Sequence, residues 1–431
     1  MFKDILKNEI ITQKSILIIL FLLIIKIFLG FYVDNINPSF FNSIDSEGYV
    51  HAAKQLCETG NFLDKNNNAE ATRMPGMSII LLPAVCLDLN INHYVILLNS
   101  LMILLSAYFT FKIVKIMRIE ISYVFIFSIY FLDPTITRYQ FQILTEIPFL
   151  FLITIVLYTF ILGFSKNRSY YLFLGFVLIT ISTFIRPLTL YLPYYLMIFF
   201  ILLFIFRRFF QINFRHQFII ACLLGTLLHF SLTQIWSYRN YLETDHKELS
   251  FIQSVNLYYY ITAGIIAKGE KREWVKVRNE FIEKTKNFTN KEISNIAKKK
   301  FKKTIMKYPI ETVQVGLEGA FMTFLTPGTG QYAKMLNISN KNYKNINNLF
   351  IFYGLLWITL VWLLFFYGAF KIEKNIYFLF LFLVFNYLML TSSGPQSYSR
   401  FRIPFNPIII IFVSVAVENF LKKYKKFKKQ L

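Results

Sequence analysis

The sequence predicts an all-α membrane protein, a polytopic helical bundle of about ten spans with helical loops on one face. Two observations lead to this prediction. Hydrophobic residues make up 55% of the 431 residues, against about 45–50% in a typical soluble protein. They also gather in long runs nearly free of charge, such as Phe149–Leu162 and Phe350–Phe366. Extended to about 20 residues, such runs are typical of transmembrane helices.

The predicted spans are joined by short connections, apart from two long loops. They cover residues 15–33, 93–116, 121–133, 146–164, 170–186, 188–206, 217–236, 347–370, 376–392 and 403–421. The run Ile305–Thr326 is placed at the outer interface as an amphipathic helix, because Glu311, Gln314 and Glu318 interrupt it. If it crossed the membrane, the number of spans would rise by one. The first run reads as a retained anchor, and Lys26 within it is expected to snorkel to the interface.

Lysine and arginine concentrate in alternate connections, and this bias predicts the orientation of the bundle. The basic connections hold Lys112, Lys115 and Arg118; Lys166 and Arg168; Arg207, Arg208 and Arg215; and Lys371 and Lys374. The Lys-rich tail 422–429 has the same parity. Because cytoplasmic loops carry the excess of positive charge, we expect these connections and both chain ends in the cytoplasm. The protein is then integral to the plasma (inner) membrane, and the other connections face outward.

This topology divides the chain into three regions. They are an N-terminal membrane module (1–236) whose first outer loop (34–92) carries the candidate acid, an outer loop with interfacial helices (237–346), and C-terminal membrane helices with a basic tail (347–431). In the first loop, Gly48–Thr59 is predicted to be a helix, and Pro75–Leu87 a second helix along the membrane. The basic stretch Glu270–Lys303 is interpreted as a solvated helix over anionic lipid.

Short polar clusters interrupt the apolar chain, and the predicted topology places all of them on the outer face. They are Asp45–Glu47, Arg73–Gly76, Leu144–Glu146, Ile185–Pro187, Trp236–Asn240, Pro327–Gly330 and Arg400–Pro404. Charged groups are costly near a bilayer core and mark function when they recur there. The convergence of these clusters on one face therefore predicts a single active site, with Pro327–Gly330 interpreted as a turn.

Three carboxylates in these clusters are candidate catalytic groups: Asp45, Glu47 and Glu146. A carboxylate at the membrane surface can act as a general base, taking a proton from an acceptor hydroxyl or amine as it attacks a sugar carbon. Ordinary structural interpretations stay open beside this one. Asp45 or Glu47 can cap the helix that begins near Gly48, and Glu146 can be an acid in the first turn of its own helix.

Five arginines on the same face form the complementary set: Arg73, Arg186, Arg239, Arg400 and Arg402. Guanidinium groups bind phosphate oxygens through paired hydrogen bonds. A phosphate leaving group at the membrane surface needs such neutralisation as its bond to a sugar breaks. For any one arginine, contact with lipid headgroups is the simpler interpretation, but the set as a whole predicts a donor-phosphate site.

Other kinds of chemistry find little support in the sequence. The net charge of +22 sits mostly at span ends and in one loop, which favours membrane orientation over nucleic-acid binding. Nucleotide motifs and metal-ligand spacings are absent from the sequence, although Asp45 and Glu47 leave a divalent ion open as a weaker option. Cys57 and Cys86 lie in one outer loop and can pair. The run Tyr258–Tyr260 is interpreted as part of an interfacial aromatic belt.

Six short motifs follow one another along the chain. They are Asp45-Ser-Glu-Gly-Tyr49, Arg73-Met-Pro-Gly76, Leu144-Thr-Glu146, Phe184-Ile-Arg-Pro187, Trp236-Ser-Tyr-Arg-Asn240 and Arg400-Phe-Arg-Ile-Pro404. In order and context they resemble the GT-C superfamily of integral-membrane glycosyltransferases, above all the branch of the protein O-mannosyltransferases and the aminoarabinose transferase of lipid A. The resemblance covers most of residues 30–270 and 390–420. Many relatives have adjacent Asp and Glu where Ser46 intervenes here, which puts the role of Glu47 in doubt.

This resemblance implies that Asp45 is the catalytic acid or base, that the arginines hold a lipid-linked phosphate, and that the donor is a polyprenyl-phosphate sugar. We therefore expect a glycosyltransferase acting on a lipid, glycan or protein acceptor at the outer face, with Glu146 orienting the reacting groups and no cofactor. Two alternatives stay open. A transporter or flippase predicts buried charges within spans and two related halves, and an O-antigen-type polymerase or ligase gives no role to an acid after the first span.

Overall fold

The computed structural model describes residues 13–206, 216–338 and 343–430, and these residues are helical apart from loops and one isolated bridge between Leu63 and Ala69. The elements in chain order are α2 (Gln13–Ile36), η1 (Pro38–Phe41), α3 (Ile44–Thr59), α4 (Pro75–Cys86), α5 (Ile91–Ile116), α6 (Tyr123–Leu132), α7 (Pro134–Gln140), α8 (Glu146–Lys166), α9 (Ser169–Ile185), η2 (Pro187–Thr189), α10 (Leu192–Ile205), α11 (His216–Thr244), α12 (Ile252–Val255), η3 (Asn256–Thr262), α13 (Ala263–Gly269), α14 (Trp274–Lys284), α15 (Asn290–Lys307), α16 (Pro309–Leu325), α17 (Tyr332–Met335), α18 (Tyr343–Lys371), α19 (Ile376–Ser392), η4 (Ser399–Phe405) and α20 (Asn406–Gln430).

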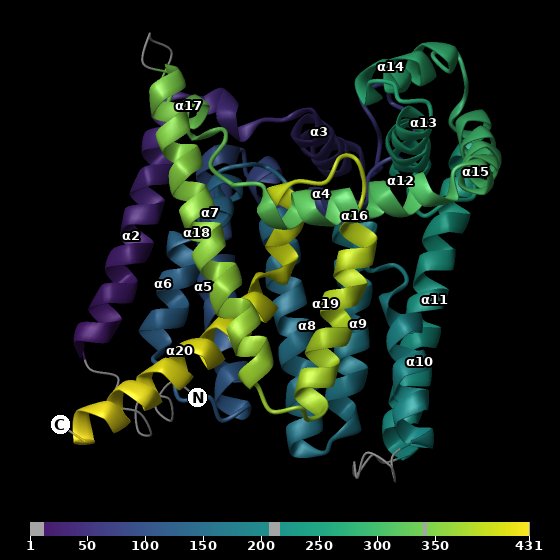
Figure 1. Cartoon of the computed structure of the whole chain (residues 1–431). Helices are drawn as coiled ribbons and strands as arrows, with labels where there is room; N and C mark the ends of the chain where they lie inside the picture. The colour runs from purple at the N-terminus through teal and green to yellow at the C-terminus, as the bar shows by residue number, and fades with distance from the viewer. Residues whose placement is uncertain (1–12, 207–215, 339–342, 431) are drawn as a thin grey trace.

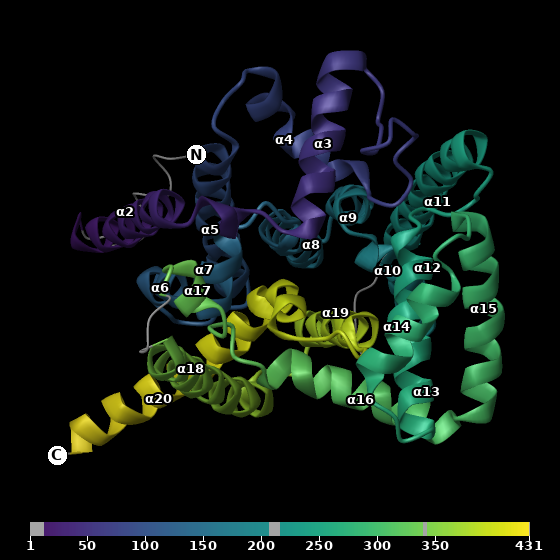
Figure 2. The ribbon, with the colours of Figure 1, turned by 90° about the horizontal axis from the view of Figure 1, so that it is seen from above.

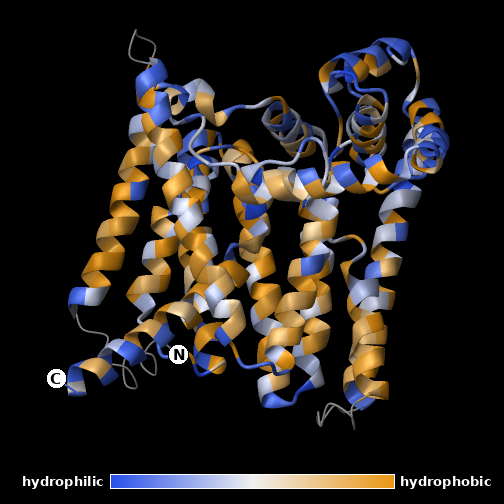
Figure 3. Cartoon of the chain, viewed as in Figure 1, coloured by the Kyte–Doolittle hydropathy of each residue, from blue (hydrophilic) through white to orange (hydrophobic). Residues whose placement is uncertain are grey.

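The apolar helices run alongside one another as a bundle (Figures 1 and 3). Within the described residues, seven of them are long and apolar enough to cross a membrane: α2, α5, α8, α10 with η2, α11, α18 and α20 with η4. The shorter apolar helices α6, α9 and α19 fall on the remaining predicted spans. The structure thus confirms the predicted all-α fold, and the long apolar helices define a multi-pass membrane protein.

One end of the bundle carries the two long loops, and we name it the loop face. It holds α3, α4 and α12–α17, while both described chain ends lie toward the opposite end (Figure 1). Helices α4 and α16 lie across the axis of the bundle rather than along it (Figure 1). The side chains of Ile310, Val313, Leu317 and Phe321 on α16 are exposed at the helical spacing of one apolar stripe. Both segments are thus helical as predicted, and their placement at the membrane interface stays a prediction.

The core of the bundle lies around α8 and α20. Within their most apolar windows, 67% of α8 and 83% of α20 are buried inside the protein, against 17% of α2, which is peripheral. Close helix packing needs glycine at some of these contacts. A Cβ on Gly368 of α18 would lie 1.9 Å from the carbonyl oxygen of Phe412 on α20, so the two backbones meet directly.

One expectation about a polar group in the membrane region is wrong. Lys26 is buried and donates a hydrogen bond to Thr137 Oγ1 rather than reaching the interface. The acceptor lies on α7, a short helix in the connection between the third and fourth predicted spans. Asp133 caps α7 by accepting from the Ile136 backbone N–H at 2.9 Å. A buried ammonium requires such partners because the hydrocarbon offers none.

The long outer loop folds as a unit with its own small core. We name residues 246–307 the loop unit; it contains α12, η3, α13, α14 and α15. Tyr258 is buried there and stacks on Phe281 with ring centroids 4.5 Å apart, and Val277 and Ala297 belong to the same core. The expectation that Tyr258 belongs to an aromatic belt is therefore wrong. Seen from above (Figure 2), the loop unit lies to one side of the bundle, and α3 crosses above the ends of α8 and α9.

Candidate active site at the loop face

Four charged side chains from four separate elements meet at the loop face. Asp45 belongs to the first turn of α3, and Glu146 is the first residue of α8. Arg186 follows the last residue of α9, and Arg400 lies in η4. The residues are far apart in sequence, but each is held where a helix begins or ends. We name these four residues the carboxylate cluster.

Glu146 is the centre of the carboxylate cluster. Its side chain has no exposed surface, and its Oε1 accepts from Arg186 Nη1 at 2.8 Å and from Arg400 Nε. Among the described residues, its second oxygen, Oε2, has no hydrogen-bond partner. A buried charge is costly unless it is paired, and here one carboxylate brings two guanidinium groups together. The interpretation of Glu146 as only a favourable first-turn acid leaves these two contacts unexplained.

Asp45 is the most accessible member of the cluster. Its Oδ2 lies 3.4 Å from both Nη1 and Nη2 of Arg400, and 40% of its side chain is exposed, against 18% for Arg400. Asp45 does not cap α3. Ser43 does, since its hydroxyl accepts from the backbone N–H of Ser46 in a capping box. The Asp45 carboxylate is therefore not used by the helix terminus, and it faces a cation instead.

Arg73 lies against the first turns of α3, and its Nη1 pairs with the buried carboxylate of Glu70, whose Oε2 is 3.5 Å away. Its Nη2 donates to the Ile44 carbonyl at 3.5 Å, and its guanidinium carbon is 5.8 Å from the centre of the Tyr49 ring. A Cβ on Gly48 would lie 2.4 Å from that carbon. Glycine at this position therefore leaves the space that Arg73 occupies.

Tyr49 and Tyr139 are aromatic neighbours of the cluster that sequence reasoning did not select as site residues. Burial, together with the negative charges of Asp45 and Glu146, raises the pKa of Tyr49 to about 12, against the opposing effect of Arg400 and Arg73. Tyr139 on α7 is buried, and within the described chain its hydroxyl has no partner. No pattern in the sequence points to Tyr139, because α7 itself was not expected.

The segments that carry Arg73 and Arg186 pack on each other. Gly76 in the first turn of α4 approaches the end of α9 so closely that a Cβ would lie 2.6 Å from the Phe184 carbonyl oxygen. The disulfide between Cys57 and Cys86 then joins α3 to the end of α4. These contacts fix the first outer loop against the span ends that present the cluster.

Besides Arg73, three predicted site residues lie outside the carboxylate cluster: Glu47, Arg239 and Arg402. Glu47 pairs with Lys65, whose ammonium lowers the pKa of the Glu47 carboxyl, and both side chains are largely exposed. Positions two apart on a helix point to different sides, which separates Glu47 from Asp45. Asp45 and Glu47, which we considered as ligands of one divalent ion, thus pair with different basic side chains, Arg400 and Lys65. In the part of the chain that the structure describes, three or more His, Cys, Asp or Glu side chains nowhere gather as a metal site.

Arg239 and Arg402 bind main-chain carbonyls instead of carboxylates. Arg239 on α11 donates to the Glu70 and Phe62 carbonyls at 2.9 and 3.0 Å, which ties the first outer loop to the bundle. Arg402 is buried and donates from Nη1 to three carbonyls of residues 323, 324 and 326, and from Nη2 to Thr135 Oγ1 at 2.7 Å. We name Arg239 and Arg402 the anchor arginines, because their donors are used to join segments.

A further carboxylate with little exposure, Glu248, organises the loop unit. It accepts hydrogen bonds from Ser254, Ser294 and Lys298 and pairs with His246. Burial alone would raise the pKa of the Glu248 carboxyl, but these hydrogen bonds outweigh it and lower the pKa to about 2. Nearby, the Ser250 hydroxyl donates to the Thr72 carbonyl, so the loop unit also supports the segment before Arg73.

Comparison with known proteins adds no closer assignment: no family model matches the chain, and no curated protein matches it. The fold and the site define a multi-helix, apolar membrane protein with a charged cluster at one end of its bundle. The finer likeness to glycosyltransferases rests on the motifs alone.

Proposed function

We propose that the protein is a glycosyltransferase that moves a sugar from a polyprenyl-phosphate donor to a lipid, glycan or protein acceptor. One observation carries the proposal: a partly exposed carboxylate, Asp45, lies 3.4 Å from a guanidinium group that a buried glutamate also holds. Lipid-phosphate sugar transfer needs a base for the acceptor and cations for the leaving phosphate within one site. Both are present at the boundary between the apolar bundle and the polar loops.

In this reaction, Asp45 removes the proton from the acceptor hydroxyl or amine. The electron pair released on the acceptor atom forms the new bond to the anomeric carbon of the sugar. The bond between that carbon and the phosphate oxygen breaks, and its electron pair leaves with the polyprenyl phosphate. Arg400 and Arg186 neutralise the added charge on that oxygen, since a guanidinium has five N–H donors and Glu146 uses only some of them. Attack from the face opposite the phosphate inverts the anomeric carbon.

The charge balance of the cluster suits this sequence of events. Two guanidinium groups and two carboxylates sum to zero before the reaction. When Asp45 accepts a proton, the cluster becomes positive by one charge, at the moment when the leaving phosphate becomes more negative. A site that gains positive charge as the transition state forms stabilises that state more than the bound donor.

The loop face is proposed to face away from the cytoplasm, with the protein in the plasma (inner) membrane. Two independent observations support this orientation. Three described connections rich in Lys and Arg, at residues 112–118, 166–168 and 371–374, lie at the opposite end, as the bias of cytoplasmic loops requires. The disulfide Cys57–Cys86 belongs to the loop face, and disulfides persist in oxidising compartments. The donor would then be used at the outer leaflet.

Replacement of Asp45 by Asn tests the proposal. The variant keeps the size of the side chain and removes the base, so we expect transfer from radiolabelled polyprenyl-phosphate sugars to membrane acceptors to fall by about 10²-fold or more. Purified protein in lipid nanodiscs, with product formation followed by thin-layer chromatography, gives the measurement.

Asp88→Asn is the matched control, because Asp88 is an exposed residue of the same outer loop. It should transfer sugar at the wild-type rate and show the same thermal unfolding midpoint as Asp45→Asn. Wild-type activity in the Asp45 variant would refute the assignment of the base. Loss of activity in the two variants together would show that the loop, rather than the carboxylate, was disturbed.

A further inference from the structure

The C-terminal part of α20 leaves the bundle. The helix begins at Asn406 as part of the most buried candidate span and continues without a break to Gln430. It runs obliquely, and its last turns extend past α18 to the periphery, at the end opposite the loop face (Figures 1 and 2). Burial changes along the same path, since residues 406–416 are buried and residues 420–428 are exposed. We name residues 417–428 the tail helix.

One side of the tail helix is apolar. Its apolar residues are spaced by three or four positions, as in one helical stripe: Val417, Phe420, Leu421, Tyr424 and Phe427. Tyr424 and Phe427 are 65% and 60% exposed. Phe420 stacks on Tyr367 of α18, with ring centroids 4.7 Å apart. Because α18 is a candidate membrane span, the stripe begins on the side of the helix that the spans occupy.

The rest of the tail helix is cationic. Residues 422–429 include six lysines, and residues 419–431 include no Asp or Glu. Lys422 pairs with Glu418, one turn earlier on the same helix. Three further lysine side chains are exposed and pair with no carboxylate in the part of the chain that the structure describes: Lys425, Lys426 and Lys428. The tail helix therefore presents uncompensated positive charge beside its apolar stripe.

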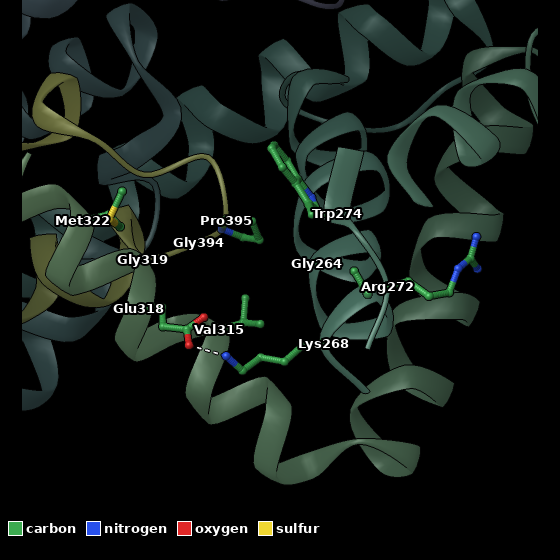
Figure 4. Close-up of a pocket in the computed structure, with 11 residues that line it drawn as sticks. Gly264, Lys268, Arg272, Trp274, Val315, Glu318, Gly319, Met322, Gly394 and Pro395 are labelled. Atoms are coloured by element: carbon green, nitrogen blue, oxygen red, sulfur yellow. Dashed lines mark hydrogen bonds and ion pairs between the residues drawn. The ribbon is translucent and has the colours of Figure 1, made fainter. Parts of the chain in front are cut away.

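The cations at the cavity between the loop unit and α16 are arranged differently (Figure 4). Lys268 of the loop unit pairs with Glu318 of α16, and Arg272 pairs with Glu270 and Glu280. Each of these cations has a carboxylate of its own and so stabilises the fold. Like charges on neighbouring turns destabilise a helix instead. An anionic partner would therefore stabilise the tail helix.

We propose that the tail helix binds the anionic headgroups of the phospholipid leaflet beside it. Leu421, Tyr424 and Phe427 insert at the boundary between headgroups and acyl chains, and the lysines contact the headgroup phosphates. Two observations favour a lipid surface over a nucleic acid or an acidic protein. The tail helix continues directly from a membrane span, so this leaflet is its neighbour. A nucleic acid would match the lysines but leave the apolar stripe in water.

Site-directed spin labelling of the full-length protein tests the proposal, which does not depend on the glycosyltransferase function. A nitroxide is attached to Phe427→Cys in a Cys222→Ala background, because Cys222 is the free cysteine among the described residues. Nanodiscs with a single copy of the protein contain phosphatidylcholine, either alone or mixed with phosphatidylglycerol. Power-saturation EPR measures the collision rate of the label with a water-soluble nickel complex. We expect phosphatidylglycerol to lower this rate about threefold or more, because lysines are drawn to an anionic surface.

Two triple variants assign this effect to the lysines of the tail helix. Replacement of Lys425, Lys426 and Lys428 by Gln should abolish the difference between the two kinds of nanodisc. The matched control replaces three exposed lysines of α15 by Gln and removes the same charge at the loop face: Lys299, Lys302 and Lys303. The control should keep the full difference, because α15 lies at the other end of the bundle (Figure 1).

Three results would overturn the proposal. Equal collision rates in the two kinds of nanodisc would show that the tail helix does not bind anionic lipid, and low rates in both would indicate that another part of the protein covers the stripe. A difference that survives the three substitutions in the tail helix would exclude a role for its lysines. Loss of the difference in the α15 control would assign the effect to the net charge of the whole protein.

Discussion

The carboxylate cluster and the anchor arginines use the same guanidinium chemistry for different ends. Arg400 and Arg402 are two residues apart in η4. Arg400 faces Asp45 and Glu146, whereas Arg402 donates to the Thr323 and Thr326 carbonyls. A neutral carbonyl fixed in the backbone cannot be replaced by a ligand without breaking the fold. In the proposed function, the contact at 3.4 Å between Arg400 and the partly exposed Asp45 is exchanged for a contact with phosphate. Under that proposal, the partner of each arginine separates the phosphate-binding groups from the structural ones.

The largest effect is expected from the anchor side of this comparison. Arg402→Met removes hydrogen bonds to buried carbonyls and to Thr135, and unsatisfied buried groups cost about 1–3 kcal/mol each. We expect the free energy of unfolding to fall by about 4 kcal/mol. Thermal unfolding of the purified variant in detergent, followed by intrinsic fluorescence, measures the change. An unchanged midpoint would show that Arg402 is not an anchor.

A carboxylate with a structural role, Glu248, makes the loop unit sensitive to acid. Its pKa, lowered to about 2 in the folded protein, lies below the ordinary value near 4.3. The stabilisation is therefore complete above the ordinary value and is lost as the pH falls through the range between the two values. The size of the shift corresponds to about 2–3 kcal/mol.

Hydrogen–deuterium exchange of residues 246–307 at pH 6 and pH 3, corrected for intrinsic rates, measures this dependence. Protection of the loop unit should fall at pH 3 in the wild type. In Glu248→Gln, protection should already be low at pH 6 and should change little with pH, since the variant carries no carboxylate to titrate. A variant that keeps the full pH dependence would assign the effect to other groups.

The sequence predicts the helices and the face on which the charged residues lie, but it does not predict which partner each side chain contacts. Spans and interfacial helices follow from apolar runs and from acids such as Glu311 and Glu318, because hydrophobic periodicity reports directly on the solvent of each face. The convergence of Asp45, Glu146, Arg186 and Arg400 also follows, because topology alone places span ends on one face.

The partner of each side chain cannot be predicted in this way. Arg400 and Arg402 share one motif and have similar surroundings in sequence, yet only the three-dimensional path of α16 brings carbonyls to Arg402. Glu47 and Asp45 are equivalent candidates in the sequence, but the helix that begins at Ile44 points their side chains to different sides. Lys26 finds Thr137 only because α7 forms. Long-range contacts of this kind carry no local signal.

A smaller effect on stability, but a larger one on binding, is expected from Arg400→Met. Glu146 keeps its 2.8 Å bond to Arg186 in this variant, so we expect the free energy of unfolding to fall by only about 1–2 kcal/mol. Affinity for undecaprenyl phosphate should fall at least about tenfold, since a charge-assisted hydrogen bond is lost. Scintillation proximity binding of the labelled lipid measures it. A stability loss as large as that of Arg402→Met would remove the distinction between the two arginines.

The smallest effect on stability is expected at Gly48, and its sign is informative. Ala is favoured over Gly inside a helix by about 1 kcal/mol, so Gly48→Ala should leave the unfolding midpoint unchanged or slightly raised. The new methyl would nevertheless lie 2.4 Å from the Arg73 guanidinium carbon, and the flexible Arg73 side chain must move away. Gly316→Ala on α16 is the matched control, because a Cβ there meets nothing within 4 Å. Only Gly48→Ala should weaken undecaprenyl phosphate binding. Equal affinity in the two variants would place Arg73 with the anchor arginines, outside the donor site.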